Sequence, residues 1–269
     1  MRRFLILGHK ATIDPGFTLN DLPGAAGRLD VLCRAVGASL FLSHGIRRDV
    51  ETHLLLQDQV HIRIRGDRVK RLNPDERSTA ALIKHALKAL GEEEAQSTPG
   101  IFVARRSLSD VLDGFLDVGA TPVVLHEEGE PAEEFAFPED PAFILSDHTE
   151  FSEQDQMLLA DSPRISLGER SLHASQAITI THYLLDRRDA DVQGDLVLVH
   201  KVWGEPKAQL MKTLLEDFGI PVNILMHAPP SLLPMTVDGL AEVRILVNAR
   251  DLEKARRVIA DYFEPPSDT

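Results

Sequence analysis

The sequence predicts an α/β fold with a mainly parallel sheet, followed by a smaller α+β unit. Short apolar runs alternate with helical patterns through the first two thirds of the 269 residues, an order typical of parallel sheets covered by helices. A polar segment at about 186–195 continues no pattern and separates off a second set of elements. We therefore expect one domain over 1–187 and a smaller one over 195–269.

The larger domain is expected to begin with a buried strand at 3–8, where the residues are mostly apolar. A helix is expected over 28–37, followed by strands at 41–43 and 52–56. The helix is predicted because apolar side chains recur there at helical spacing, namely Leu29, Leu32, Cys33 and Val36.

Residues 60–65 alternate apolar and basic side chains, as a strand with two different faces does. Gly66 and Asp67 are turn residues, and 68–72 again mixes apolar and basic side chains. The pattern therefore predicts a hairpin of 60–65 with 68–72, apolar on one face and basic on the other.

The segment 74–90 carries the clearest helix signals of the chain. Asn73 is a good N-cap, Pro74 suits the first helical position, and Glu76 would complete a capping-box-like pair. Gly91 ends the helix and opens a polar connection. The elements expected next are a strand, a helix and two strands, at 101–103, 107–117, 122–126 and 142–145.

The second unit is expected to be a small ferredoxin-like module, because its elements follow the order β-α-β-β-α. They are expected, in chain order, at 196–200, 205–218, 221–226, 243–247 and 250–263. The module resembles a family of small domains described only as signal-transducing proteins. The resemblance is carried by this order and by a few residues, such as those at 218–221 and 246–247.

Composition excludes several classes of protein. A single cysteine allows no internal disulfide and indicates a reducing compartment. The N-terminal apolar run is too short for a signal peptide, and no apolar stretch approaches the ~18 residues of a transmembrane helix. The eleven histidines show no spacing typical of a metal site. We expect a cytoplasmic protein without a membrane span.

The net charge of −13 is distributed unevenly along the chain. Residues 1–88 hold 15 Lys and Arg against 9 Asp and Glu, whereas 89–269 hold 14 against 33. An acidic protein with a basic N-terminal portion can still present cations to phosphates. The charge leaves two interpretations open: a basic patch that faces nucleic acid, or a distribution that serves only solubility.

Two apolar runs that end in polar turns, within 143–148 and 164–183, hold the best candidate for a ligand site. In the second, the loop 167–172 offers backbone amides and small side chains just before a helix. Ligands of open parallel sheets bind beyond the carboxyl ends of strands, and a helix N-terminus adds a positive field. We therefore expect a small anionic or zwitterionic ligand here.

The same region resembles the cofactor loop of the SPOUT methyltransferases, in particular the TrmY-type tRNA pseudouridine-54 N1-methyltransferases. Those proteins typically contain Ser-Leu-Gly-x-x-Ser-Leu-His-Ala here, and 166–174 of this chain matches that pattern. The resemblance covers about 1–187 and continues upstream in blocks at 8–12, 19–24, 27–34 and 72–80. It implies a C-terminal trefoil knot, a homodimer, and N1-methylation of pseudouridine in tRNA with S-adenosyl-L-methionine as the methyl donor.

By this resemblance, seven residues occupy cofactor-contacting positions: Leu125, Ser146, Leu167, Gly168, Ser171, Leu172 and Ala177. The chain departs from the family at several of these positions and nearby. Ser146 stands where the family usually has Gly, and Ala177 where it has Cys. Ser175 and Gln176 replace the family's Asp and His. If position 146 needs a positive φ, a serine there is strained, whereas Ala177 keeps a small wall.

The acceptor side of such a reaction needs groups that hold the nucleotide. Pseudouridine exposes an N1–H that must lose its proton as the methyl arrives, and a carboxylate could accept or orient that proton. Asp30 and Asp49 are therefore candidates for the base or orienting group. Arg28, Arg34 and Arg48 are candidates for gripping the nucleotide. The spacing alone favours a different interpretation, in which these residues form surface ion pairs on helices. Because the site of knotted methyltransferases is commonly shared across a dimer, these residues could act on the partner's cofactor.

The basic face of the expected hairpin could follow an RNA backbone through phosphate contacts, which carry no sequence information. Its basic residues are His61, Arg63, Arg65, Arg68, Lys70 and Arg71. A solvated edge strand protected by charge is the alternative. Two other functions also stay open. One is methylation of another pseudouridine or uridine, for instance in ribosomal RNA. The other is a non-catalytic adaptor that keeps the fold and binds a partner through its C-terminal module.

Overall fold

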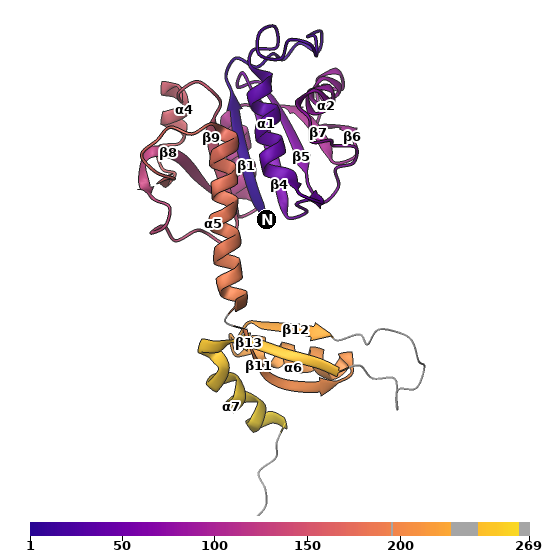
Figure 1. The fold of residues 1–269 in the computed structure, drawn as a ribbon, viewed down its shortest axis with the longest axis vertical. Helices are drawn as coiled ribbons and strands as arrows, with labels where there is room; N and C mark the ends of the chain where they lie inside the picture. Colours follow the sequence, from indigo (N-terminus) through magenta and orange to yellow (C-terminus); the bar gives the residue numbers. More distant parts are fainter. Residues whose placement is uncertain (195, 227–241, 264–269) are drawn as a thin grey trace, which may run out of the picture. The chain divides into compact units, whose positions relative to one another are not determined.

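The structure, a computed structural model of the chain, describes residues 1–194, 196–226 and 242–263. Its contacts divide the chain into two compact units, Met1–Leu184 and Leu185–Thr269 (Figure 1). Each unit has its own main sheet, of eight strands in the first and three in the second. Within the described residues, no helix has the length and apolar character needed to cross a membrane.

The eight-stranded sheet of the first unit has the order β10-β8-β9-β1-β4-β5-β7-β6. Five neighbouring strands are parallel: β1 (Arg2–Gly8), β4 (Val50–Leu56), β8 (Thr121–Pro131), β9 (Pro141–Ser146) and β10 (Arg164–Ser166). Three strands extend the sheet in antiparallel fashion: β5 (Val60–Arg65), β6 (Ala95–Thr98) and β7 (Ile101–Arg105). The predicted mainly parallel α/β sheet is confirmed. The trefoil knot stays a prediction.

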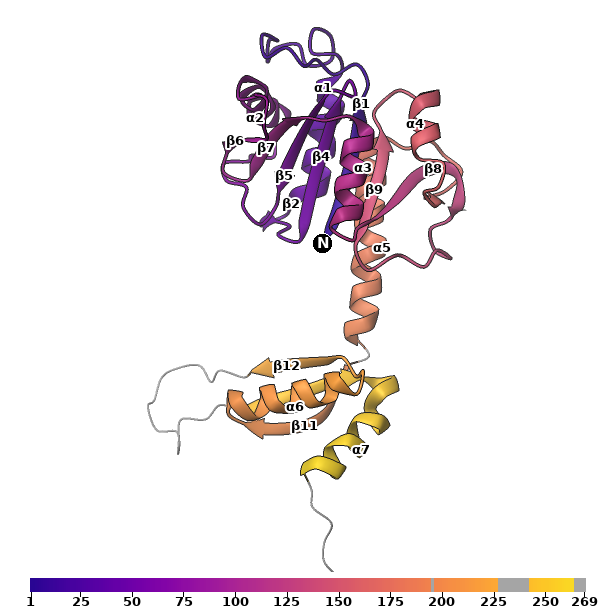
Figure 2. The same ribbon diagram turned by 180° about the vertical axis from the view of Figure 1, so that it is seen from behind.

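Helices cover both faces of this sheet. The face turned to the viewer in Figure 1 carries α1 (Leu29–Leu40), α2 (Glu76–Lys88) and the first part of α5 (Ala174–Gly194). The opposite face carries α3 (Leu108–Asp117), which lies in front of the sheet in Figure 2. Helix α1 buries Leu29, Leu32, Cys33 and Val36, as the helical spacing predicts. The remaining elements of this unit are β2 (Phe41–Leu42), β3 (Gly45–Ile46) and α4 (Glu153–Leu158).

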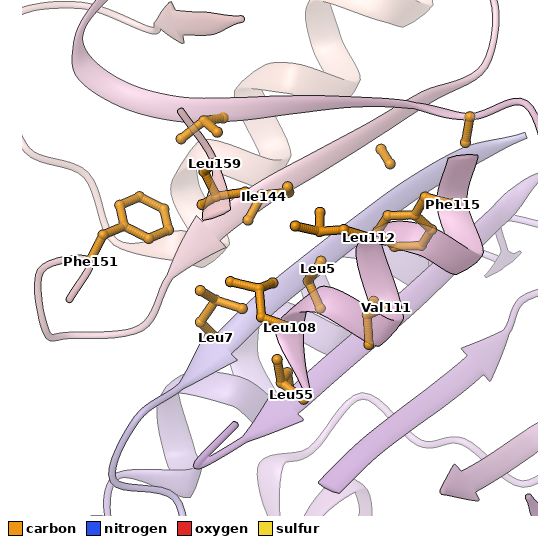
Figure 3. Close-up of a cluster of buried hydrophobic side chains, with 13 residues drawn as sticks. Leu5, Leu7, Leu55, Leu108, Val111, Leu112, Phe115, Ile144, Phe151 and Leu159 are labelled. Carbon is orange, nitrogen blue, oxygen red and sulfur yellow. The ribbon is translucent and has the colours of Figure 1, made fainter. Parts of the chain in front are cut away.

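The apolar core beneath α3 holds the central strands in place (Figure 3). Leu108, Val111 and Phe115 recur at helical spacing along α3 and are buried. They form one cluster with residues of β1, β4 and β9, among them Leu5, Leu7, Leu55 and Ile144. Because β1 and β9 are parallel neighbours in this core, their carboxyl ends meet at the same edge of the sheet.

The hairpin expected for 60–72 does not form, and that prediction is wrong. The partners of β5 are β4 and β7, so β5 is an interior strand and not an edge. The N–H of Val69 donates to the carbonyl oxygen of Arg65 at 2.8 Å, which turns the chain away. Val69 is buried against Gly100, where an added Cβ would lie 2.4 Å from the Val69 nitrogen. The apolar residues of 68–72 therefore serve packing instead of a strand.

Three boundaries also differ from expectation. Helix α2 begins at Glu76, because the Asp75 side chain, and not Asn73, caps it by accepting a hydrogen bond from Ser78 N at 2.7 Å. The polar connection expected after Gly91 contains β6, which pairs with β7. Helix α5 continues through the polar stretch at 186–194, where the sequence shows no apolar stripe.

The second unit has the predicted β-α-β-β-α order. Its elements are β11 (Leu196–Trp203), α6 (Glu205–Asp217), β12 (Val222–Met226), β13 (Glu242–Asn248) and α7 (Leu252–Phe263), with a short 3₁₀ helix η2 (Ala249–Asp251) before α7. The central strand β13 pairs antiparallel with both neighbours. Val243, Ile245 and Val247 alternate along β13 and are buried in one core with residues of α6 and α7. The small α+β module is thus confirmed.

Candidate active site

A pocket of about 480 Å³ opens beyond the carboxyl ends of β9 and β10. Its lining comes from three segments: 125–127 in β8, 145–151 after β9, and residues within 167–177. This is the edge at which open parallel sheets bind ligands. The structure brings together here all seven residues that the sequence assigns to a cofactor: Leu125, Ser146, Leu167, Gly168, Ser171, Leu172 and Ala177.

Gly168 gives the loop after β10 its shape. Its φ of +127° is rare for residues with a side chain, and nothing lies within 4 Å of the position that a Cβ would take. Ser166 fixes the turn, because its hydroxyl donates to the Gly168 carbonyl oxygen at 3.1 Å and accepts from the Gly168 nitrogen at 3.2 Å. The loop therefore presents its backbone to the pocket in a defined conformation.

The departures from the family's residues leave the pocket intact. Ser146 does not have a positive φ, so the strain considered for a serine at this position is absent. Its hydroxyl donates to the carbonyl oxygen of Thr149 and closes the turn after β9. The Gln176 side chain accepts a hydrogen bond from His173 N at 3.0 Å, at the start of α5. Ala177 is buried and forms part of the wall.

Sequence reasoning missed a charged cluster beside this pocket. His9 Nε2 lies 2.8 Å from Asp155 Oδ2, and His9 Nδ1 lies 3.5 Å from Asp147 Oδ1. Asp147 lines the pocket. The hydrogen bond to Asp147 raises the pKa of His9, burial lowers it, and Asp155 raises it again, to about 9. The sequence offers one partial signal, since His9 and Asp147 each come just after an expected strand, but the pairing of β1 with β9 that brings them together is seen only in the structure.

Asp30 forms the centre of the acceptor-side candidates. Arg28 donates to both of its carboxylate oxygens, from Nε at 3.0 Å and from a terminal nitrogen at 3.2 Å. Arg34 donates at 2.9 Å from the next turn of α1. Burial raises the pKa of Asp30, but the two arginines outweigh it and hold that pKa below its usual value. Neither Arg28 nor Asp30 lines the pocket; the pKa of Arg28 is raised chiefly by Asp30 and to a smaller extent by the charge of the pocket residue Asp147.

The other two acceptor-side candidates lie elsewhere in the same chain. Arg48 donates to the Gly66 carbonyl oxygen at 2.8 Å, and the exposed Asp49 side chain lies 3.8 Å from Arg2 Nε. Both precede β4, at the amino-terminal end of the parallel strands, whereas Arg28 and Asp30 begin α1 at the opposite end. The 12-residue helix α1 spans roughly 18 Å. A single chain therefore does not bring the two groups together.

The five predicted RNA-binding residues fall into two sets. Arg63 and Arg65 point from β5 towards carboxylates: Arg63 lies 3.0 Å from Glu94, and Arg65 lies 2.9 Å from Asp67 and 3.4 Å from the buried Glu51. The other three, Arg68, Lys70 and Arg71, are exposed, and Arg68 Nε lies 3.5 Å from Asp67. Among the described residues, no group of three or more His, Cys, Asp or Glu could hold a metal ion.

Comparison with known proteins identifies the family. Residues 1–190 match a family described as "Putative SAM-dependent RNA methyltransferase". The tRNA (pseudouridine(54)-N(1))-methyltransferase of Haloarcula marismortui is 49% identical over 192 residues, which cover 69% of this chain and 96% of that protein. The enzyme of the same name from Halobacterium salinarum is 48% identical over 197 residues, 71% of this chain and 99% of that protein. The chain belongs to this methyltransferase family. The resemblance predicted from the sequence is thus confirmed.

Two further comparisons concern the fold of the methyltransferase unit and the C-terminal module. The crystal structure of Archaeoglobus fulgidus Nep1 bound to S-adenosylhomocysteine aligns with a TM-score of 0.51 at 18% identity, over 70% of this chain and 98% of that chain. At this identity the alignment supports the fold. Residues 204–262 match a family described as "Putative prokaryotic signal transducing protein", in agreement with the resemblance stated for the second unit.

Proposed function

We propose that this protein transfers a methyl group from S-adenosylmethionine to N1 of pseudouridine 54 in transfer RNA. The pocket beyond β9 and β10 carries the proposal, because every cofactor position predicted from the family motif lines it. Its volume of about 480 Å³ lies within the roughly 300–1,000 Å³ of small-molecule sites. The two near-full-length relatives named for this reaction support the choice of substrate.

The residues of the pocket fit S-adenosylmethionine. Leu125, Leu167 and Leu172 are apolar and suit the faces of an adenine ring. Nothing lies within 4 Å of the position that a Cβ of Gly168 would take, so a ligand can approach the backbone there with its polar groups. When bound, S-adenosylmethionine supplies an electrophilic methyl group on a sulfonium. The work left to the chain is to hold both reactants in line and to exclude water.

Asp30 is suited to orienting the nucleotide. Its carboxylate is ionised at neutral pH, and two arginines lower its basicity, so it serves better as a hydrogen-bond acceptor than as a strong base. An acceptor of this kind can hold an N1–H in the direction of the methyl group. Arg28, bound to Asp30 through two nitrogens, presents a fixed cation for a carbonyl or phosphate of the same nucleotide.

A homodimer is part of the proposal. Arg48 and Asp49 lie about one helix length from Arg28 and Asp30 in the same chain, so a second copy is the simplest way for all four groups to serve one site. Light scattering at micromolar concentration should therefore give about twice the chain mass of 29.8 kDa. A species of 29.8 kDa at every concentration would remove the shared site.

The test of the reaction is methyl transfer to a defined RNA. Radiolabelled S-adenosylmethionine is incubated with a tRNA that carries pseudouridine at position 54, and with the same tRNA carrying uridine there. Label is expected at N1 of the pseudouridine, and none in the uridine control. A parallel incubation uses ribosomal RNA. Label in that RNA and none in the tRNA would favour the alternative substrate. Absence of cofactor binding by calorimetry would favour the non-catalytic adaptor.

A further inference from the structure

One wall of the pocket is attached to the sheet at both of its ends, and both attachments involve the end of β1. The wall is the segment 145–151, which continues into α4. At its start, Asp147 N donates to the Leu7 carbonyl oxygen at 3.1 Å, and the Asp147 carboxylate accepts from His9 N at 3.1 Å. Just beyond its far end, the Oδ2 atom of Asp155 in α4 lies 2.8 Å from His9 Nε2.

The geometry determines the protonation of His9. Its two ring nitrogens face Asp147 and Asp155, and ionised carboxylates only accept hydrogen bonds. The imidazolium form, which donates from both nitrogens, matches this arrangement, and the pKa of His9, raised to about 9, agrees with it. Asp155 is already fixed by the capping box of α4, where it accepts from Ser152 N at 2.8 Å and from Ser152 Oγ at 2.7 Å. The charged ring thus connects two carboxylates that are each held by their own turn.

We propose that His9 is a positioning residue for the cofactor, whose charged ring clamps both ends of the segment 147–155 in the shape that binds S-adenosylmethionine. His9 is not part of the pocket lining, whereas Asp147 and Phe151 are, so its effect passes through the wall. The inference rests on the proposed function in one respect, the identity of the ligand.

The clamp predicts an effect on cofactor binding that is separate from tRNA binding. Arg28 and Asp30 are held by their own two-nitrogen contact, and Arg28 N donates to the Pro23 carbonyl oxygen at 3.2 Å. These interactions do not include His9. Loss of the clamp should therefore raise the KM for S-adenosylmethionine and leave the affinity for tRNA within about twofold of wild type. A general loss of structure would instead weaken the binding of both.

The experiment is calorimetric titration of S-adenosylhomocysteine into the full-length protein. His9→Gln keeps a hydrogen-bonding side chain but removes the charge and one of the two contacts. It should weaken binding about tenfold, the scale of one charge-assisted hydrogen bond. His85→Gln on the exposed side of α2 is the matched control and should bind as wild type. If H9Q binds within twofold of wild type, the clamp is refuted while the proposed function stands. If the wild type does not bind, both are refuted.

A pH series gives a second, independent readout. The groups facing the ring are Asp147 from the β9 side and Asp155 from α4, with His148 3.4 Å from Asp147 and the charge of Arg28 also acting on Asp147. The pKa of His9 is raised to about 9, so the clamp is complete at neutral pH and is lost as pH rises through about 9. The affinity ratio of wild type to H9Q should therefore fall towards one across this range. The ratio removes the titration of the ligand's own amino group, which is common to both proteins.

Asp155→Asn keeps the test decisive if H9Q does not fold. The variant removes one of the two carboxylates that raise the pKa of His9. The pH at which affinity for S-adenosylhomocysteine declines should therefore move below that of the wild type. A midpoint unchanged from wild type would show that the ring does not control the wall.

Discussion

Replacement of Gly168 by alanine separates the shape of the cofactor loop from the stability of the fold. The added Cβ meets no atom within 4 Å, so no clash contributes. The φ of +127° is the whole cost, and residues held in such sparsely populated regions cost about 1–3 kcal/mol. In the free protein the loop can shift to relieve this strain, whereas the bound state needs the original shape. Most of the cost should therefore appear in binding.

The expected loss of affinity follows from that energy. At about 1.4 kcal/mol per tenfold, a cost of about 1–3 kcal/mol corresponds to roughly 5- to 150-fold weaker binding of S-adenosylhomocysteine. Calorimetry measures the affinity, and thermal unfolding of the free protein measures stability. Gly168→Val should lose at least as much, because a β-branched residue is still more restricted at this φ.

Gly119→Ala is the matched control for this experiment. Gly119 also has a positive φ, of +76°, and open space around the missing Cβ, but it ends α3 outside the pocket. Its replacement should lower stability by about 1 kcal/mol and leave cofactor affinity unchanged. If Gly168→Ala folds and binds as tightly as wild type, the loop after β10 does not set the cofactor site.

Two further predictions concern the nucleotide and the RNA backbone. Asp30→Asn should reduce the rate of methylation by about 100-fold or more while tRNA affinity changes much less, because the side chain is proposed to act on the reacting nucleotide; equal losses in kcat and affinity would assign it to binding. Combined replacement of the exposed residues Arg68, Lys70 and Arg71 by alanine should weaken all tRNAs alike and reduce the salt dependence of binding by up to about three units. Replacement of the ion-paired Arg63 should leave that slope unchanged. If the salt dependence of tRNA binding is unaltered in the triple variant, these three residues do not contact RNA and serve only solubility.

Local pattern was sufficient for much of the fold. The alternation of apolar runs and helical stripes predicts the order of most elements in the first unit and of the β-α-β-β-α series in the second, because burial of one face fixes the period of each element. The local pattern fails where contacts with a distant segment determine the structure. The segment 68–72 looks like a strand, but Gly100 accepts Val69 at a distance that only a glycine permits, and β7 takes the position beside β5. A pattern within one segment does not contain that neighbour.

The candidate site divides in the same way. The cofactor loop was predictable because a contiguous motif around Gly168 forms most of one wall. The cluster of His9, Asp147 and Asp155 was not predictable, since its members are up to 146 positions apart along the chain and meet through the pairing of β1 with β9. Arg48 and Asp49 are the opposite case. Their residue types grouped them with Arg28 and Asp30 in the sequence, but the structure places them at the other end of α1.

The position of Cys33 makes the native protein resistant to thiol chemistry. Cys33 is the sole cysteine of the chain, it lies on the buried face of α1, and burial raises the pKa of its thiol to about 12. Because the thiolate is the reactive form, alkylating reagents should react slowly with Cys33 in the folded protein. With alanine at position 177, the pocket also has no sulfur to lose. A cysteine introduced on the surface would consequently be labelled selectively. The slow rate at which Cys33 itself is labelled would report the rate at which α1 opens.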